Sequence, residues 1–259
     1  MRNERESYNT PYTGKLLEHL AYPMGGIGAG MICLEGAGAL SHVSVRGEPN
    51  VHNEPLMFAA LAIKDAPKLA RVLEGPVPGW KIFSPHDAGN GLGGTDYGLP
   101  RFEDAAFASR FPFGNVTLRD GQVPVQVTIT GWSPFTPGNP DSSSLPVAAL
   151  EYAFHNPTDA PIHMVFSFHA RNFMAVQDSD GAAVQATENG FVLSQTGSEE
   201  KPWQAGAFSA SVDDPKTKVN CAWFRGGWWD PLTMVWQSVR EAATPAAEPL
   251  TEGAASPGG

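Results

Sequence analysis

The fold is decided by the stretch Gly131-Trp-Ser-Pro-Phe-Thr-Pro-Gly-Asn-Pro-Asp-Ser-Ser-Ser-Leu-Pro-Val-Ala-Ala-Leu-Glu-Tyr-Ala-Phe-His155, in which a turn-rich loop leads into an alternating segment. From 149 to 155, large apolar side chains take every second position, which is the period of a half-buried strand. A turn at 156–160 precedes a second alternating run at 162–169, so the two runs predict a β-hairpin. A third alternating run at 123–130 precedes the loop. Three such runs in succession predict an all-β layer.

The rest of the chain also has short strands between turns. Gly 28 and Pro 23 together make up about a fifth of the residues, above the usual share and below the disordered range. Further strands are expected at 39–45, 57–63, 183–187, 190–195, 206–212 and 220–225. We therefore predict an all-β fold: a large, supersandwich-like, two-sheet antiparallel β-sandwich that is truncated at its C-terminus.

One short C-terminal helix is predicted after residue 229. Asp230 suits the N-cap, because its carboxylate can accept a free backbone N–H, and Pro231 suits the first turn. Leu232, Trp236 and Val239 recur at helical spacing on one face. The predicted domain organisation is an N-terminal extension at 1–20 followed by one β-sandwich domain at 21–259, incomplete at its C-terminus.

Composition excludes several classes of protein. The net charge of −10 and the lack of a Lys/Arg cluster argue against nucleic acid as a partner. Two cysteines, Cys33 and Cys221, cannot build a disulfide framework, and their apolar surroundings indicate buried free thiols. The charged N-terminus lacks a signal-peptide core, and no apolar run is long enough for a transmembrane segment. We expect a cytoplasmic location.

Two segments are candidates for contacts with a ligand or another domain. The glycines at 25, 26, 28 and 30 do not have dinucleotide-binding spacing, so Gly26 and Gly28 are interpreted as a tight strand edge lying against another domain or a ligand. The loop at 46–55 gathers Arg46, His52 and Asn53 with two acids. It is a candidate because function concentrates on loops. An ordinary surface connection remains the alternative for this loop.

No catalytic or metal-binding group emerges from the sequence. His163 and His169 share a strand face but would lie ~20 Å apart, too far to bind one ion, so neither a metal nor a cofactor is expected. The serines at 142–144 lack a nucleophile elbow. Paired acids at 103–104, 199–200 and 213–214 are expected to be solvated in turns, whereas a glycosidase needs two carboxyls that face each other.

Several tryptophans lie in or beside predicted loops rather than at alternating strand positions. They are Trp80, Trp132, Trp203, Trp228 and Trp229. Exposed tryptophans suit stacking against a sugar, and they suit a domain interface equally well. The interface is the preferred interpretation.

Four motifs together resemble glycoside hydrolase family 116, the bile acid β-glucosidase or non-lysosomal glucosylceramidase family, and look closest to its bacterial members. The motifs are Tyr22-Pro-Met-Gly-Gly-Ile-Gly-Ala-Gly-Met-Ile32, the loop from Gly131 to Pro146, Val165-Phe-Ser-Phe-His-Ala-Arg-Asn172 and Ala222-Trp-Phe-Arg-Gly-Gly-Trp-Trp-Asp230. The resemblance covers nearly the whole chain. It implies an N-terminal β-sandwich that precedes an (α/α)6 barrel, which would carry a Glu nucleophile and an Asp acid for retaining hydrolysis of β-glucosides.

The chain does not contain that barrel, so no catalytic residue of the family transfers to it. We predict an accessory domain that packs against its own missing barrel and shapes the rim of the active site, and that does not hydrolyse β-glucosides or glucosylceramide-like substrates alone. The candidate rim or interdomain residues are Gly26, Gly28, Arg46, His52, Asn53, Trp132, Trp228 and Trp229. A free-standing carbohydrate-binding module and a purely structural interaction domain are the alternatives.

Overall fold

The computed structural model describes residues 10–66, 68–82, 95–223, 230–243 and 252–254. The chain forms two compact units. Unit 1 comprises Met1–Ala59 and Arg71–Ile162, and unit 2 comprises Ala60–Ala70 and His163–Gly259. The described residues form four sheets. In three of them the paired strands are antiparallel, and the fourth is a three-stranded sheet in the order β11-β5-β6. The predicted all-β class is confirmed.

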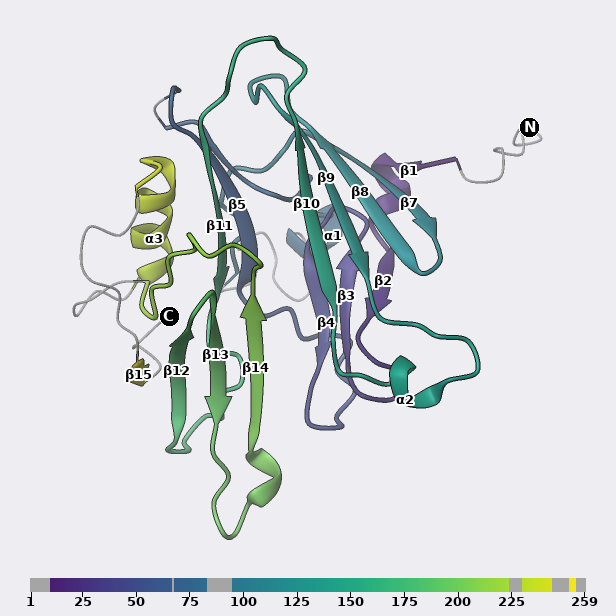
Figure 1. Cartoon of the computed structure of the whole chain (residues 1–259), viewed down its shortest axis with the longest axis vertical. Coiled ribbons are helices and arrows are strands. Elements are labelled where there is room, and N and C mark those ends of the chain that lie inside the picture. The colour runs from purple at the N-terminus through teal and green to yellow at the C-terminus, as the bar shows by residue number, and fades with distance from the viewer. Residues whose placement is uncertain (1–9, 67, 83–94, 224–229, 244–251, 255–259) are drawn as a thin grey trace. The chain divides into compact units, whose positions relative to one another are not determined.

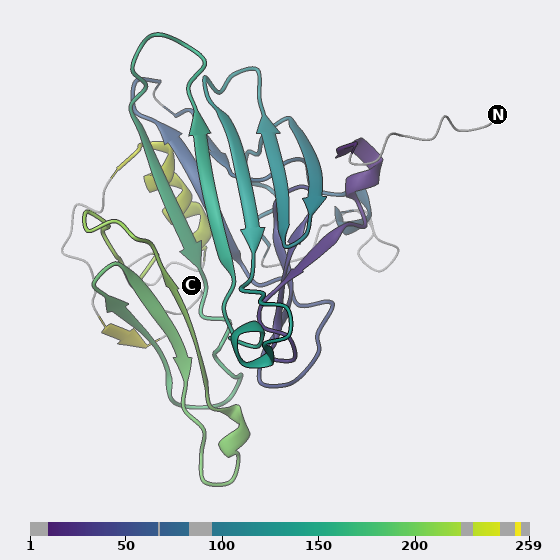
Figure 2. The same cartoon turned by 45° about the vertical axis from the view of Figure 1, so that its right-hand side comes forward.

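Unit 1 is a two-layer sandwich (Figures 1 and 2). One layer is a five-stranded sheet in the order β1-β7-β8-β9-β10, and the other is a three-stranded sheet in the order β2-β3-β4. The strands of the first sheet are β1 Tyr12–Thr13, β7 Asp104–Arg110, β8 Phe113–Arg119, β9 Gln126–Trp132 and β10 Ala149–His155. Those of the second are β2 Ala21–Met24, β3 Met31–Glu35 and β4 Leu40–Ser44.

The two layers of unit 1 are held together by apolar side chains from alternate strand positions. Val116 on β8 and Ile129 on β9 are fully buried. Gly131 lies on the same face of β9 as Ile129, and a Cβ there would meet Met24 Sδ at 2.6 Å, so the second sheet packs directly onto its backbone. The rings of Tyr22 and Phe107 meet across the layers with 6.2 Å between centroids. The alternation read from the sequence therefore sets which face of the sheet is the core.

β5 (Met57–Ile63) is buried at all seven residues, as expected for a strand that is covered on both faces. It lies between β11 (Met164–Ala170) and β6 (Ala70–Val72). The boundary between the units falls within β5, after Ala59. β5 is thus the strand along which the chain passes from one unit to the other.

Unit 2 contains a four-stranded sheet and a helix. The sheet has the order β14-β13-β12-β15, with β12 Ala182–Thr187, β13 Gly190–Gln195, β14 Gly206–Ser211 and β15 Glu252–Ala254. Aromatic pairs pack within the unit, such as Phe173 and Phe208 with ring centroids 4.9 Å apart. The strands predicted at 183–187, 190–195 and 206–212 are therefore confirmed to within a residue.

The predicted C-terminal helix is α3, Pro231–Arg240. Asp230 caps it, because its side chain accepts a hydrogen bond from Thr233 N at 3.2 Å. Trp236 and Val239 are buried as the spacing predicts. Shorter helical segments in unit 1 are η1 (Gly14–Leu17), α1 (Gly79–Ile82) and α2 (Pro140–Ser143), and η2 (Pro202–Gln204) lies in unit 2.

The predicted hairpin is wrong. β10 pairs with β9, from Ala149 opposite Trp132 to His155 opposite Gln126, whereas β11 joins the sheet of β5. The turn at 156–160 forms as expected, with Asn156 Nδ2 donating to Ala160 O at 2.7 Å. It carries the chain out of the five-stranded sheet, because Ile162 ends unit 1 and His163 begins unit 2. A turn sequence fixes the reversal of the chain and leaves open which strand the next one joins.

Two other local predictions need correction. The glycine run is not a strand edge: Gly25, Gly28 and Gly30 have positive φ and build the turn between β2 and β3. The strand predicted at 220–225 is absent from its described part, 220–223. The predicted burial of Cys33 and Cys221 as free thiols is confirmed. None of the described helices is long and apolar enough to cross a membrane.

Candidate functional site

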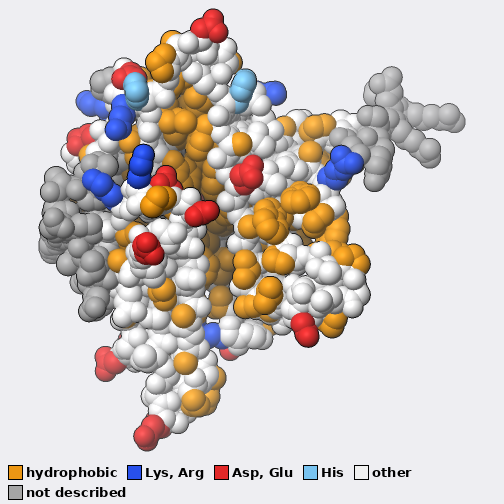
Figure 3. Space-filling model, viewed as in Figure 1, with side chains coloured by type: hydrophobic (Ala, Val, Ile, Leu, Met, Phe, Trp, Pro, Cys, Tyr) orange, Lys and Arg blue, Asp and Glu red, His pale blue; other side chains and the backbone are white. Residues whose placement is uncertain are grey.

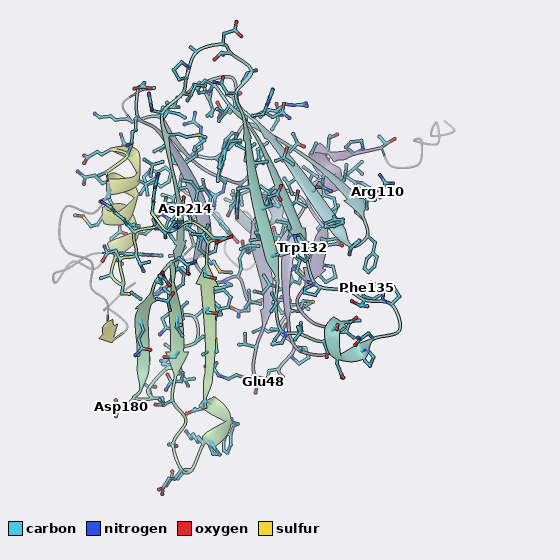
Figure 4. All side chains as sticks on the ribbon, in the orientation of Figure 1. Glu48, Arg110, Trp132, Phe135, Asp180 and Asp214 are labelled. Carbon is cyan, nitrogen blue, oxygen red and sulfur yellow. The ribbon has the colours of Figure 1, made fainter. Side chains whose placement is uncertain are left out.

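Three connecting segments of unit 1 meet at one surface. They are the glycine turn at 25–30, the turn at 111–112 between β7 and β8, and the loop at 133–148 between β9 and β10. Phe111 and Phe135, from two of these segments, form an edge-to-face ring pair with centroids 4.9 Å apart. Figure 4 labels Trp132 and Phe135 on this part of unit 1.

The glycine turn is fixed against the long loop by backbone contacts. Gly25 N donates to Ser133 Oγ at 2.6 Å, and Ile27 N donates to Ser143 O at 2.9 Å. Gly26 lies so close to the loop that a Cβ would meet Leu145 O at 2.3 Å. The close approach predicted for Gly26 is therefore present, and its partner is a loop of the same unit. The contact leaves the side chain of Ile27 65% exposed.

Large apolar side chains gather on these segments. Phe111 is 68% exposed and Phe113 is 42% exposed. We call the patch the aromatic surface: Ile27, Phe111, Phe113, Trp132, Phe135, Leu145 and Val147. In Figure 3, hydrophobic side chains cluster on the right-hand side of the view over this part of unit 1. Contiguous exposed apolar patches are typical of surfaces that bind a partner.

A second candidate is a buried ionic cluster in unit 1. Lys81 on α1 places Nζ 2.7 Å from Glu35 Oε1 and 2.8 Å from Glu54 Oε2. The Tyr97 hydroxyl donates to the same oxygen of Glu54 at 2.8 Å. Burial lowers the pKa of Lys81, but the two carboxylates raise it more, so the net shift is upward and the ammonium stays charged.

The same cluster continues through Arg101. Arg101 Nε lies 3.1 Å from Glu74 Oε2, and Nη2 lies 2.8 Å from Asp96 Oδ1 in an ionic contact that lacks hydrogen-bond geometry. Burial, together with the charge of Asp96, raises the pKa of Glu74 to about 8. Burial also raises the pKa of Asp96, with Arg101 acting in the opposite direction. The raised pKa of Glu74 favours its protonated form at neutral pH.

Buried acids with raised pKa values invite comparison with a catalytic pair, but the cavity beside them is too small. Glu54, Glu74 and Asp96 line a space with room for about one water molecule. A pyranose ring cannot enter it, and two of the acids are ion-paired to Arg101. The cluster instead fixes α1 and the segment at 95–101 to the end of β3. Sequence reasoning missed it because the charged residues are scattered singly along the chain.

The loop at 46–55 does not place its predicted residues in one site. Asn53 donates to Val43 O at 2.8 Å and so ties the loop to β4. His52 is exposed, and Arg46 has a positive φ at a bend. Within this loop, only Glu54 reaches the ionic cluster. Gly28 is open to solvent, since a Cβ there would meet nothing within 4 Å.

The predicted tryptophans also lie in different parts of the structure. Trp132 belongs to the aromatic surface, where it forms an edge-to-face pair with Phe113 at 6.3 Å between centroids. Trp80 stacks on His19, and Trp203 is exposed in unit 2. Trp228 and Trp229 lie outside the described residues. The structure thus brings the glycine turn and Trp132 to one part of unit 1, where Gly26 itself is buried against the loop at 133–148. Arg46, His52 and Asn53 lie in a separate loop.

No group of three or more His, Cys, Asp or Glu side chains is arranged to hold an ion among residues 10–66, 68–82, 95–223, 230–243 and 252–254. His169 on β11 donates or accepts a 2.9 Å hydrogen bond with Ser167. Burial lowers the pKa of His169 to about 4, so its ring is neutral at neutral pH.

Unit 1 is thus a β-sandwich whose connecting segments carry an exposed aromatic surface. The family model described as beta-glucosidase 2, glycosyl-hydrolase family 116 N-term, matches residues 21–255. The chain therefore belongs to glycosyl-hydrolase family 116, as its N-terminal domain. No curated protein matches the chain.

Proposed function

We propose that the chain is the accessory domain of a retaining β-glucosidase, and that it packs against the catalytic (α/α)6 barrel of its own protein and shapes the rim of the active site. The substrates of the whole protein would be β-glucosides or glucosylceramide-like glycosides. The family match supports an accessory role, because the matching model is that of an N-terminal domain. The chain alone would not hydrolyse these substrates.

The observation that carries the proposal is the aromatic surface. Phe111 and Phe135 pack on each other, yet both keep large exposed fractions, 68% and 41%. Burial of apolar surface contributes roughly 25 cal/mol per Å², so covering these rings would stabilise an assembly. Ordinary surface loops rarely present so many large apolar side chains together.

The test compares three proteins in hydrolysis of an aryl β-glucoside. They are the chain of 259 residues, the polypeptide that the complete reading frame encodes, and that polypeptide with Phe111→Ser and Phe135→Ser. We expect no turnover by the chain alone and turnover by the complete polypeptide. The double variant should lose thermal stability and several-fold in kcat/KM, because the rim is no longer held.

A Trp203→Ser variant of the complete polypeptide is the matched control. Trp203 is 65% exposed, similar to Phe111, but it belongs to unit 2, whereas the aromatic surface belongs to unit 1. Turnover by the chain purified from a host without β-glucosidase would refute the accessory role. Equal behaviour of the double variant and the control would refute docking through the aromatic surface.

A further inference from the structure

We propose that β14 pairs along its free edge with β14 of a second copy of this chain, about a two-fold axis at Ser209. The proposal concerns unit 2 and goes beyond the accessory role, which rests on the aromatic surface of unit 1. β14 ends the sheet β14-β13-β12-β15, and Figure 1 shows it on the side of β13 that faces away from β12. No strand among the described residues pairs with its other edge.

The hydrogen-bond pattern shows which backbone groups β14 presents at this edge. Val212 N donates to Asn189 O at 3.0 Å, one position beyond the last pair of the ladder between β13 and β14. Hydrogen-bonded pairs alternate along an antiparallel ladder, so positions 206, 208 and 210 also bond to β13. The remaining residues of the strand are exposed and direct their backbone N–H and C=O groups away from β13: Ala207, Ser209 and Ser211.

β14 lacks the features that usually protect a sheet edge. Edge strands are commonly very short, or carry charged side chains, proline or a bulge. β14 has six residues without a charge or a proline, and its register with β13 is unbroken from Gly206 to Ser211. At the opposite edge of the same sheet, β15 has three residues and includes Glu252. An edge of this length without protection is a template for a further strand.

The sequence of β14 fits a second copy of itself. Two-fold pairing at Ser209 places this residue opposite its own copy and Ala207 opposite Ser211. These are the residues with free backbone groups, so they would form hydrogen-bonded pairs with about six hydrogen bonds in all. On the other face of the strand, Phe208 would lie opposite Ala210, so a large side chain meets a small one across the axis.

Charge also selects this edge for contact between copies. The net charge of −10 opposes association of the chain with itself. The segment from Gly206 to Val212 carries no charge, and like charges directly opposite each other in a sheet are destabilising. In the two-fold register, the first charged residue after the strand, Asp213, would lie opposite Ala205 and not opposite an acid. Pairing through β14 therefore avoids direct repulsion between the copies.

The test measures dimerisation of the 259-residue chain by sedimentation equilibrium. All proteins carry Phe111→Ser and Phe135→Ser, so that the aromatic surface of unit 1 does not contribute. We expect a dimer that dissociates on dilution and does not grow further, because a two-fold pair closes on itself. Ser209→Lys should weaken dimerisation about tenfold or more, since the two lysines face each other at the axis, and Ser209→Glu should do the same. An equimolar mixture of these two variants should restore dimerisation to within about threefold of the parent value.

Two further variants separate the free edge from the rest of the sheet. Ser209→Pro removes an N–H that points away from β13, a position at which edge strands accept proline, and it should also weaken dimerisation about tenfold or more. Gln185→Lys is the matched control. Gln185 is exposed on β12 and lies in the same cross-strand row as Val192 and Ser209, but two strands in from the free edge. This variant should leave dimerisation unchanged within about twofold.

The proposal is overturned if the parent chain is monomeric at about 100 µM, or if Ser209→Lys leaves the dimer intact. It is also overturned if Gln185→Lys weakens the dimer as much as Ser209→Lys does. If both charged variants dissociate the dimer but their mixture does not restore it, the edge pairs with a different segment, and the two-fold pairing is wrong. Failure of the aromatic surface to bind a catalytic barrel would not change these outcomes, since β14 belongs to unit 2.

Discussion

At the scale of single residues, the buried acids of unit 1 decide how stability depends on pH. The pKa of Glu74 is raised from 4.5 to about 8, because burial disfavours its charged form and Asp96 repels it. The folded state therefore holds a proton that the unfolded state loses above pH 4.5. The stability from Glu74 is fully present below that pH and is lost as the pH rises to about 8.

Glu74→Gln should remove this dependence. The variant has an uncharged side chain of the same shape, so we expect its free energy of unfolding to fall less between pH 5 and pH 8 than that of the natural chain. The difference should be on the order of a few kcal/mol over this range. Urea unfolding at several pH values measures it. Glu48→Gln, at an exposed bend of unit 1, is the control and should leave the slope unchanged. If the free energy of unfolding changed equally with pH in Glu74→Gln and in the natural chain, the raised pKa of Glu74 would be contradicted.

Gly26 is a residue whose role is set by space. A Cβ would meet Leu145 O at 2.3 Å, and the clash is with backbone, which cannot move aside like the end of a side chain. We expect Gly26→Ala to lower the free energy of unfolding by roughly 1–3 kcal/mol, as in other overpacked sites. Gly79→Ala is the control, since a Cβ there meets nothing within 4 Å. Thermal unfolding compares the Gly26→Ala and Gly79→Ala variants. Equal melting temperatures would show that the loop at 133–148 can shift to accommodate the added Cβ.

At the scale of elements, the helix α3 depends on its first residue outside the helix. Asp230 accepts a hydrogen bond from Thr233 N, and hydrogen bonds with Thr233 lower the pKa of this carboxyl. The stabilisation by the cap is thus fully present above the ordinary pKa of an aspartate and is lost as the pH falls through the lowered pKa of Asp230. The helix also buries Val235, Trp236 and Val239, so its tertiary packing adds to the cap.

Asp230→Ala should destabilise α3 by about 1 kcal/mol, the usual cost of losing a capping side chain. Faster hydrogen exchange of the amides at 233–236 would report the loss, while exchange in the strands of unit 1 should not change. Asp230→Asn retains an acceptor and should behave almost like the natural chain. Unchanged exchange in Asp230→Ala would mean that packing of the buried face alone holds the helix.

At the scale of the whole molecule, the aromatic surface sets how the chain behaves in solution. Exposed Phe111, Phe135 and Leu145 carry no charge that would keep copies apart locally, although the net charge of −10 opposes association overall. We expect the chain to associate reversibly as its concentration rises, and Phe111→Ser with Phe135→Ser to reduce this several-fold. Sedimentation velocity at several concentrations measures it, with Trp203→Ser as the control. A monomer at every concentration would argue against an unpartnered apolar patch.

Much of the fold was determined by the sequence itself. Period-two alternation from 123 to 130 and from 149 to 155 predicted two strands, which form at Gln126–Trp132 and Ala149–His155, because side chains of a strand must point to opposite sides of the sheet. The cap at Asp230 and the buried face of α3 also follow from local chemistry. The family resemblance, carried by long motifs, agrees with the match over residues 21–255.

Pairing and site geometry were decided only by the tertiary structure. The adjacency of β10 and β11 in sequence suggested a hairpin, but β10 pairs with β9, since strand partners are chosen by the burial of whole faces and not by the intervening turn. The ionic cluster of Lys81 and Arg101 and the contact of Phe111 with Phe135 join residues that are distant in sequence. No local pattern encodes such contacts, because they exist only once the two layers have packed together.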